Sequence, residues 1–215
     1  MWQVIPGGSA NYVRVLTQPF RDKIRTGVAV EQIERHARGV SLRLADGSTH
    51  HHDAVVIATH ADSALSLLKD PSPEEQTLLN AFRFEPNDVV LHTDERLLPR
   101  VPAARAARNF RIRQGADRGC SLTYDMNVLQ SLHAKRRYLV SLNLTDLIDP
   151  TTILGRWNYA HPIYTPQAVA AQGQIDQISG HRNTYYAGAY WRYGFHEDGV
   201  VSGLRVLRQL GVTQS

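Results

Sequence analysis

The residues best suited to chemistry in this sequence are a tyrosine and a histidine beside turns. Tyr124 precedes Asp125 in the segment YDMN, and His161 precedes a proline in HPIY. A phenol or an imidazole that faces a cavity can transfer a proton, so Tyr124 and His161 are candidate acid–base residues. Each also has a structural interpretation, because Asp and Asn favour turns and a histidine before proline suits an extended corner. The catalytic residues stay undecided between these alternatives.

Metal chemistry is not indicated by the histidines or by the single cysteine. His50, His51 and His52 are consecutive. Neighbouring residues of a strand point to opposite faces, so these three side chains do not converge easily on one ion. Cys120 has no second thiol, which excludes a disulfide within the chain. We predict no metal site and assign Cys120 to a strand.

A glycine-rich, aromatic stretch near the C-terminus is the candidate binding site. An uncharged run from Tyr185 predicts a buried strand, Gly188 and Gly194 permit a sharp turn, and a helix is predicted from Asp198. The apolar residues of that helix recur near the spacing of one helical face, at Val200, Val201, Leu204, Leu207 and Leu210. A helix that starts here directs unpaired N–H groups and partial positive charge at the turn. An electron-rich ligand therefore fits there.

The aromatic residues of this turn have two interpretations. Six of them lie between Tyr185 and Phe195, and they form either a wall for a flat ligand or a tightly packed junction. Gly199 and Gly203 share one helix face, which permits the close approach of a ring or of a packed strand. The acidic pair just before Gly199 partly occupies the positive field of the helix. A neutral carbonyl edge therefore fits better than a phosphate.

Two strands must meet for this turn to become a site. Residues 54 to 59 form a continuous apolar run, typical of a central parallel strand, and a short helix over 61 to 68 follows. We predict that the strands near 54 to 58 and 184 to 188 are neighbours in one layered α/β unit. The reason is that each is followed by a glycine, an alanine or a helix start at what would be the same carboxyl edge.

The rest of the pattern predicts a hairpin, a first helix and a second unit. Residues 39 to 44 alternate as a strand, Asp46-Gly47 predicts a hairpin, and Ser9 is expected to cap the first helix. Further expected strands are DVVLHTD, 120–124, 138–144 and 153–160, and further expected helices are EEQTLLNAF, the start of AARAARNFRIR, 126–132 and 166–178. The predicted fold class is mixed α/β (α+β). Residues 1–81 and 164–215 form part of a layered α/β unit, and residues 82–163 form a mixed-sheet domain.

Composition narrows the class of protein. The chain has 215 residues, 42% of them hydrophobic and 20% charged, which is ordinary for a globular protein with a core. It contains no run of about eighteen apolar residues and no signal-peptide pattern at its start. We therefore expect no transmembrane segment and a cytoplasmic location. The net charge of +4 comes from scattered basic residues, so no nucleic-acid partner is indicated.

The run AGAYWRYGFHEDGVVSGLRVL resembles the C-terminal flavin-contacting segment of the flavin amine oxidase superfamily, most closely its bacterial branch of FAD-dependent oxidoreductases or NAD/FAD-binding proteins. Other segments agree in the same order, namely PGGSANYVRVL, DAVVIATHADSALSLL, NDVVLHTDERLLP, LTYDMNVLQ and HPIYTPQAV. The resemblance spans nearly the whole chain. It implies FAD as the cofactor, a small organic or lipid-like substrate, and residues 82–163 as the substrate domain. The flavin then performs the redox chemistry.

The resemblance also implies which residues contact the cofactor. The expected cofactor-binding residues are Gly7, Gly8, Thr59, Gly188, Tyr193, Gly194, Asp198, Gly199 and Val200. Backbone N–H groups near Gly199 and Val200 are expected to face the carbonyl edge of the flavin ring. His60 follows Thr59 close to the dinucleotide in this family, although by itself it suits an ordinary loop.

One feature of the family is missing from this sequence. No G-x-G-x-x-G turn follows any strand, and that turn holds the ADP half of FAD. We therefore expect the chain to correspond to the C-terminal part of a longer flavoprotein, to hold FAD weakly when alone and to be inactive. The alternative is a non-catalytic fragment or split subunit that needs a partner chain carrying the motif. A nicotinamide-dependent enzyme is disfavoured because the same fingerprint is missing.

The strands near Val55 and Tyr185 are expected to lack neighbours. Both strands belong to a sheet that is incomplete without the missing motif, so their exposed faces favour association with other polypeptides.

Overall fold

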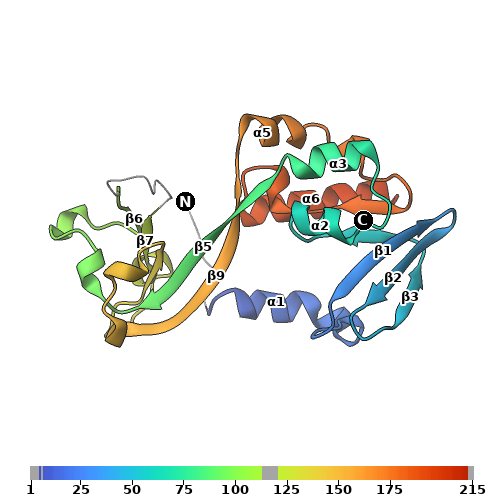
Figure 1. Ribbon diagram of the computed structural model, residues 1–215. Helices are drawn as coiled ribbons and strands as arrows, with labels where there is room; N and C mark the ends of the chain where they lie inside the picture. Colours follow the sequence, from blue (N-terminus) through green and yellow to red (C-terminus); the bar gives the residue numbers. More distant parts are fainter. Residues whose placement is uncertain (1–4, 6, 113–120, 213–215) are drawn as a thin grey trace. The chain divides into compact units, whose positions relative to one another are not determined.

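The computed structural model describes residue 5, residues 7–112 and residues 121–212, and the chain divides into two compact units. The unit called here the layered unit comprises Arg25–Glu85 and His161–Ser215, and the mixed-sheet unit comprises Met1–Ile24 and Pro86–Ala160. The chain passes between them along two long strands, β5 (Arg83–His92) and β9 (Ile153–Ile163), which Figure 1 shows in green and orange. The mixed α/β class predicted from the sequence is confirmed. The roles of the two units stay a prediction.

The layered unit contains the parallel strand pair predicted from the sequence. β4 (Val55–Ile57) pairs with β10 (Thr184–Tyr186), in the register Val55 with Thr184 and Ile57 with Tyr186. The two strands are neighbours although the whole mixed sheet lies between them in the sequence. Short apolar strands of this kind depend on cover from helices, because a parallel sheet is buried on both faces.

An antiparallel sheet also belongs to the layered unit. Its strands are β1 (Val30–His36), β2 (Gly39–Leu44) and β3 (Thr49–His52), in that order. The predicted hairpin joins β2 to β3, and Gly47 has a φ of 82°, a region that glycine adopts without steric cost.

Four helices complete the layered unit. They are α2 (Ala61–Leu67), α3 (Pro73–Asn80), α5 (Pro166–Gln172) and α6 (His196–Gln209). α3 begins with a capping box, because Ser72 Oγ accepts from the Glu75 N–H and Glu75 Oε2 accepts from the Ser72 N–H. The helix predicted over 166–178 is interrupted at Gly173. Only α5 is α-helical, and a 3-10 turn, η6 (Ile175–Gln177), follows it.

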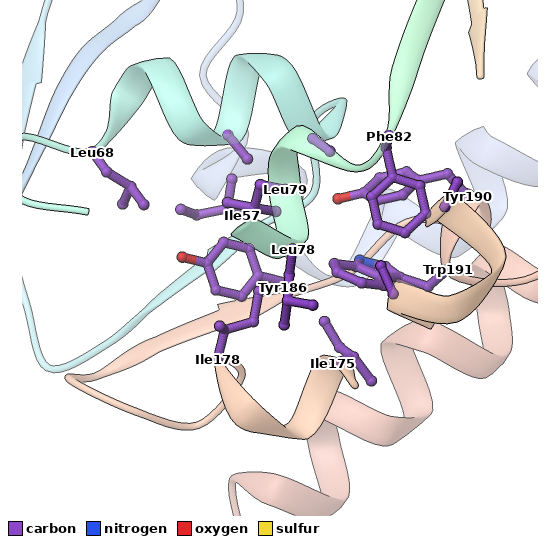
Figure 2. Packing of buried hydrophobic residues seen from close by; sticks show 14 of the residues in the cluster. Ile57, Leu68, Leu78, Leu79, Phe82, Ile175, Ile178, Tyr186, Tyr190 and Trp191 are labelled. Atoms are coloured by element: carbon purple, nitrogen blue, oxygen red, sulfur yellow. The ribbon is translucent and has the colours of Figure 1, made fainter. Parts of the chain in front are cut away.

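The core of the layered unit lies on the Ile57 and Tyr186 side of the strand pair. Ile57 and Tyr186 are buried together with side chains from α2, α3 and α5. Figure 2 shows Tyr186 beside Ile57 and Leu79, with Phe82, Tyr190 and Trp191 gathered next to them. Phe82 contacts Tyr190 and Trp191 edge to face, with ring centroids 5.0 and 4.8 Å apart. Each fully buried large apolar side chain contributes about 1.5–3 kcal/mol to folding.

A buried ionic network ties the antiparallel sheet to this core. Arg35, on β1, donates from Nη1 to Glu75 Oε1 at 2.5 Å and from Nε to Asp70 Oδ1 at 3.1 Å. Tyr186 Oη donates to the same Glu75 oxygen at 2.7 Å. Burial opposes ionisation of Glu75, but its hydrogen bonds to Arg35, the Ser72 N–H and Tyr186 prevail and lower its pKa. Glu75 therefore stays charged inside the fold.

In the described residues of the mixed-sheet unit, five strands form a sheet in the order β6-β7-β8-β5-β9. The three not yet described are β6 (Arg108–Phe110), β7 (Leu122–Asp125) and β8 (Leu139–Leu142). Short helical turns join the strands, namely η2 (Glu95–Leu97), η3 (Pro102–Ala104), α4 (Met126–Leu129), η4 (Thr145–Leu147) and η5 (Pro150–Thr152). The helix predicted at the start of AARAARNFRIR is limited to η3, because the next residues pair with β7 as β6. Cys120 lies outside the described residues.

The first helix contributes no buried side chain to the fold. α1 (Ser9–Thr17) continues into the 3-10 segment η1 (Gln18–Lys23), and neither contains a buried residue. Its N-cap is Gly8, and Ser9 is already the first helical residue, so the predicted cap at Ser9 is wrong. Gly7 and Gly8 have φ values of 81° and 80°, and the chain is therefore turned into the helix before Ser9.

Candidate functional site

One hydroxyl group fixes the turn between β10 and α6. Gly188 follows β10, and the 3-10 turn η7 (Ala189–Trp191) comes next. Ser202 Oγ, on α6, accepts from the Gly188 N–H at 2.9 Å and donates to the Gly199 carbonyl at 2.8 Å. Ser202 is buried, so water does not compete for these bonds. The end of the strand is thereby joined to the first turns of the helix.

Two contacts from earlier segments hold the same turn. Gln172 Nε2, on α5, donates to the carbonyl oxygens of Tyr190 at 3.0 Å and of Arg192 at 2.5 Å. Gly194 has a φ of 85°, and Tyr164 Oη would lie 2.7 Å from a Cβ added to Gly194. Glycine is therefore required at position 194, both for its backbone conformation and for the approach of the phenol.

Asp198 caps the start of α6 instead of facing outward. Its Oδ2 accepts from the Phe195 N–H at 3.0 Å, and its Oδ1 lies 3.5 Å from Arg192 Nε. Asp198 is buried. Burial, and then the charge of Asp198, raise the pKa of Tyr164 and keep this phenol protonated. The carboxylate thus fixes the helix start, and its contact with a cofactor stays a prediction.

The unpaired N–H groups of α6 lie one turn earlier than expected. The helix begins at His196 rather than at Asp198, so the Gly199 N–H already donates to the Phe195 carbonyl at 3.3 Å. Within the part of the chain that the structure describes, the N–H groups of His196 and Glu197 have no partner, as first-turn groups of a helix lack one. The unpaired donors at this helix start therefore belong to His196 and Glu197, and the contact of the Gly199 and Val200 region with the cofactor stays a prediction.

The outer face at the start of α6 is open. A Cβ added to Gly199 or to Gly203 would meet no atom within 4 Å. Packing among the described residues therefore does not explain glycine at either position. Val200 is 56% exposed and Tyr193 is 74% exposed. A planar ring fits against this face without displacing a side chain, so the residues present fit a flavin.

Some aromatic residues of the turn are buried, as a packed junction requires, and others are exposed, as a wall for a ligand requires. Tyr186, Tyr190 and Trp191 are buried, whereas Tyr193 and Phe195 are exposed. Burial raises the pKa of Tyr190. In the described residues the Tyr190 hydroxyl and the Trp191 indole N–H have no hydrogen-bond partner. Three rings therefore build the packed junction, Tyr185 is half-buried, and Tyr193 is the most exposed of the six.

The carboxyl end of β4 reaches the same edge of the strand pair. Thr59 and His60 follow β4 and are exposed. The His60 ring stacks on Phe84 with a centroid distance of 4.2 Å, and Phe84 contacts Tyr190 edge-on at 5.9 Å. Because β4 and β10 are parallel, Thr59 and Gly188 leave the pair at one edge, the usual ligand-binding edge of such sheets.

The other predicted residues are not all in the layered unit. Gly7, Gly8 and Tyr124 belong to the mixed-sheet unit, and His161 belongs to the layered unit. Tyr124 is half-buried on β7, with the Arg108 guanidinium 5.9 Å from its ring centroid. His161 is exposed on β9. The cofactor role of Gly7 and Gly8 and the catalytic roles of Tyr124 and His161 stay predictions.

Our sequence reasoning missed the side chains that hold the turn. Ser202 lies three residues after Gly199, a spacing at which a helical hydroxyl reaches a carbonyl of the preceding turn, so a signal was present. Gln172 and Tyr164 gave no such signal, because their contacts join segments that are distant in sequence.

The histidines of β3 diverge, as the strand alternation requires. His51 Nδ1 lies 2.9 Å from Ser41 Oγ, whereas His50 Nε2 lies 2.9 Å from Arg25 Nη1. No group of three metal-binding side chains is found in residues 7–112 and 121–212. Over the same residues, no helix combines the length and the hydropathy needed to cross a membrane.

Solved structures share the fold at low identity. Cyclohexylamine oxidase from Brevibacterium oxydans IH-35A is 14% identical, with a TM-score of 0.62 over 96% of this chain and 52% of that chain. Putrescine oxidase bound to putrescine is 10% identical, with a TM-score of 0.64 over 96% and 53%. A CLA-producing fatty acid isomerase from P. acnes is 14% identical, with a TM-score of 0.56 over 84% and 47%. This chain therefore spans about half the length of each.

The family follows from the sequence itself. The sequence profile described as flavin containing amine oxidoreductase matches residues 3–210. Curated proteins gave no match. The matched range covers almost all of the sequence, including the open α6 start and the strand pair behind it. The chain belongs to the family of flavin containing amine oxidoreductases, whose cofactor is FAD.

Proposed function

We propose that this chain forms the flavin-ring end of an FAD-dependent oxidoreductase of the amine-oxidase type. The observation that carries the proposal is the open face of α6, where Gly199 leaves space within one turn of the unpaired N–H groups of His196 and Glu197. Open glycines at the positive end of a helix fit the approach of a planar, electron-rich ring. When bound, FAD supplies the hydride-accepting chemistry.

The residues around the proposed ring position provide hydrogen-bond donors and side chains that keep the turn in place. With a flavin bound, the N–H groups of His196 and Glu197 would stabilise negative charge on an electron-rich edge of the ring. Arg192 lies beside the Asp198 carboxylate, so Asp198 opposes this field less than an unpaired acid would. Ser202 and Gln172 hold the turn before any ligand arrives, and pre-ordered donors cost no reorganisation during the reaction.

The proposal for the substrate concerns the domain that binds it and the residues that could transfer a proton. We assign residues 82–163 to the substrate domain, and residues 1–81 and 164–215 to the FAD-binding domain. Tyr124 and His161 are the candidates for proton transfer to or from the substrate. Enzymes that share the fold are named for an alicyclic amine, a diamine and a fatty acid. This range supports a small organic or lipid-like substrate.

A second proposal concerns activity of the chain alone. The described residues of the layered unit form a parallel pair of only two strands, and the chain spans about half of each solved chain. We infer that FAD binding and activity need a segment carrying the G-x-G-x-x-G motif, either earlier in the same polypeptide or on a partner chain, and that residues 1–215 alone are non-catalytic. We also propose the cytoplasmic location that the sequence predicts.

The experiment is a titration of residues 1–215 with FAD, followed by flavin fluorescence and then by gel filtration. We expect saturable binding that is lost on the column, because the ADP half has no glycine-rich turn to hold it. Losing two or three charge-assisted hydrogen bonds, at about 1.5–3 kcal/mol each, weakens binding by about two orders of magnitude or more. Flavin that stays on the column in stoichiometric amounts contradicts the need for a partner. A complete lack of binding contradicts the flavin site.

A matched pair of glycine variants tests the ring position. Gly199→Leu places a side chain in the open space, and we expect about tenfold weaker flavin binding through loss of the ring contact. Gly173→Leu is the control, because a Cβ at Gly173 makes only an ordinary contact at 3.9 Å. Circular dichroism checks that both variants fold. Equal flavin affinity in the two variants contradicts the role of Gly199.

A further inference from the structure

Positive charge gathers at the end of the mixed sheet where β6 is the edge strand, beside β7 (Figure 1). Residues 100–112 contain four arginines, residues 126–138 contain one lysine and two arginines, and neither segment contains Asp or Glu. The two segments meet, because β6 pairs with β7 and α4 follows β7 directly. Asn127 of α4 donates from Nδ2 to the Arg136 carbonyl at 2.9 Å. The two segments therefore form one basic region.

Carboxylates neutralise only part of this charge. Glu95 Oε2 lies 3.4 Å from Arg105 Nη1 and 3.6 Å from Arg137 Nε, and Arg137 also pairs with the buried Asp125. The other five cations are exposed, and among the residues that the structure describes none of them forms an ion pair with a carboxylate. These five, called here the basic surface, are Arg100, Arg108, Arg111, Lys135 and Arg136.

Large apolar side chains lie among these cations and are exposed with them. Phe110 is 71% exposed and Ile112 is 95% exposed, and the two flank Arg111 in the sequence. Phe110 shares a face of β6 with Arg108, because residues two apart on a strand point the same way. Val101 is exposed as well. Exposed apolar side chains that gather in this way mark an interaction site.

The combination of cations and apolar side chains fits the surface of an anionic membrane. Lysine and arginine attract lipid phosphates, while apolar side chains enter the boundary between the headgroups and the acyl chains. Nucleic acid is the competing partner, because its phosphates attract the same cations. Phe110 could stack on a base, but the aliphatic side chains of Val101 and Ile112 gain no comparable contact there. The surface therefore fits a bilayer better than it fits nucleic acid.

We propose that the basic surface, together with Val101, Phe110 and Ile112, docks the mixed-sheet unit onto an anionic phospholipid bilayer. Docking is peripheral, because no helix in the described residues is long and apolar enough to cross a membrane. The surface uses no residue of the proposed flavin site, so docking and flavin binding are tested separately. A protein docked in this way can take up molecules that are dissolved in the bilayer.

Sedimentation of residues 1–215 with lipid vesicles tests the docking. One set of vesicles contains phosphatidylcholine alone, and the other contains phosphatidylglycerol in addition. Each Lys or Arg near an anionic surface strengthens binding about fivefold, so we expect binding to the anionic set to be at least about a hundredfold stronger. This binding should be lost at about 1 M salt, where the charges are screened. Equal binding to the two sets, or no binding to the anionic set, would overturn the proposal.

Labelled oligonucleotides test the competing partner at the same salt concentration. A single strand and a duplex are titrated by fluorescence anisotropy, and their phosphate concentration at half-saturation is compared with that of the anionic vesicles. We expect the vesicles to reach half-saturation at the lower phosphate concentration, because only they accept the apolar side chains. Half-saturation by either oligonucleotide at the lower concentration would assign the surface to nucleic acid and overturn the proposal.

Two charge variants locate the contact with the bilayer. Arg111→Gln combined with Arg136→Gln removes two cations of the basic surface and should weaken vesicle binding about 25-fold, at about fivefold for each residue. Arg38→Gln combined with Arg83→Gln removes the same charge from exposed positions of the layered unit and should change binding by about twofold or less. Circular dichroism checks that both variants fold. Equal losses would mean that net charge alone attracts the chain, which contradicts docking by this surface.

Two serine variants test the apolar part of the surface. Ile112→Ser should weaken vesicle binding about tenfold, because the side chain no longer enters the bilayer. Leu16→Ser is the matched control, since Leu16 is an exposed apolar residue on α1, and it should leave vesicle binding unchanged. A larger loss for Leu16→Ser than for Ile112→Ser would place the membrane contact on α1 and overturn the proposal.

Discussion

Two glycine-rich segments precede helices in this chain, and the one before α6, called here the anchored turn, is held by side chains of other elements. The segment from Gly188 to Gly194 precedes α6 and is held by side chains of α5 and α6. Gly7 and Gly8 precede α1, a helix with no buried residue. Both segments combine glycines with an amphipathic helix, so their sequences look alike. The difference comes from side chains supplied by other elements.

Glycines allow the backbone conformation of such a turn, but contacts from other residues are needed to fix it. Glycine is favoured at position 194 by a φ of 85° and by the approach of Tyr164, and at position 188 by the close approach of the Tyr190 ring. At Gly8, in contrast, a Cβ would meet no atom within 4 Å. A site needs ordered donors, so the anchored turn is the stronger candidate of the two.

The largest predicted effect comes from the core beneath the anchored turn. Glu75→Leu leaves the Arg35 guanidinium and the Tyr186 hydroxyl without their shared acceptor. We expect the free energy of unfolding, measured in urea, to fall by about 3 kcal/mol. This is the lower end of the usual range, since Asp70 still pairs with Arg35. Glu31→Leu removes an exposed ion pair and should lower the free energy of unfolding by about 1 kcal/mol or less. Equal losses in the two variants would contradict the larger contribution of the buried network.

The same carboxylate makes stability depend on pH. The pKa of Glu75 is lower in the folded chain than its ordinary value of 4.5, because its hydrogen bonds outweigh burial. A lowered pKa adds stability that is present above the unfolded pKa and is lost as the pH falls through the folded pKa. We expect unfolding experiments to show this loss below about pH 4.5. Glu75→Gln should lose less stability over that window, and an identical slope would contradict the assignment.

A smaller effect is predicted for the bond that joins the strand to the helix. Ser202→Ala leaves the Gly188 N–H buried without its acceptor. We expect a loss of about 1–2 kcal/mol in the free energy of unfolding, with faster hydrogen exchange at Gly188. Ser66→Ala on α2 is the matched control, because its hydroxyl bonds to the Ser63 carbonyl at an exposed site. No change at Gly188 would mean that the turn is anchored elsewhere.

The smallest effect is predicted in α1. Val15 is 63% exposed, so Val15→Ser should change the free energy of unfolding by less than about 0.5 kcal/mol. Val206→Ser on α6 removes a side chain that is 3% exposed, and it should cost about 2 kcal/mol. Thermal unfolding of both variants checks the contrast. Similar losses would show that α1 is packed in solution and would break the comparison.

Much of the local structure could be predicted from residue patterns. The pairing of the β4 and β10 segments followed from two short apolar runs with similar endings, and it is confirmed. The Asp46-Gly47 hairpin and the helix after Pro73 also follow from local turn and capping chemistry. These features depend on neighbours within a few residues, or on one shared hydrophobic pattern.

The errors arose where contacts override a local preference. Ser9 is a good capping residue, but Gly7 and Gly8 had already turned the chain, so the cap lies at Gly8. The start of α6 moved from Asp198 to His196, and the unpaired donors moved with it. The acids there were assigned to the dipole correctly. That Asp198 also caps Phe195 could not be known before the helix start was placed.

The sequence by itself determined the family and the strand–turn–helix order, and it located the glycines of the turn and of α6. Only the tertiary structure decided which of those glycines are anchored and which aromatic rings are buried. The physical reason is that burial and hydrogen-bond satisfaction depend on partners from distant segments. Ser202 and Gln172, which lie on two different helices, hold the turn that follows β10.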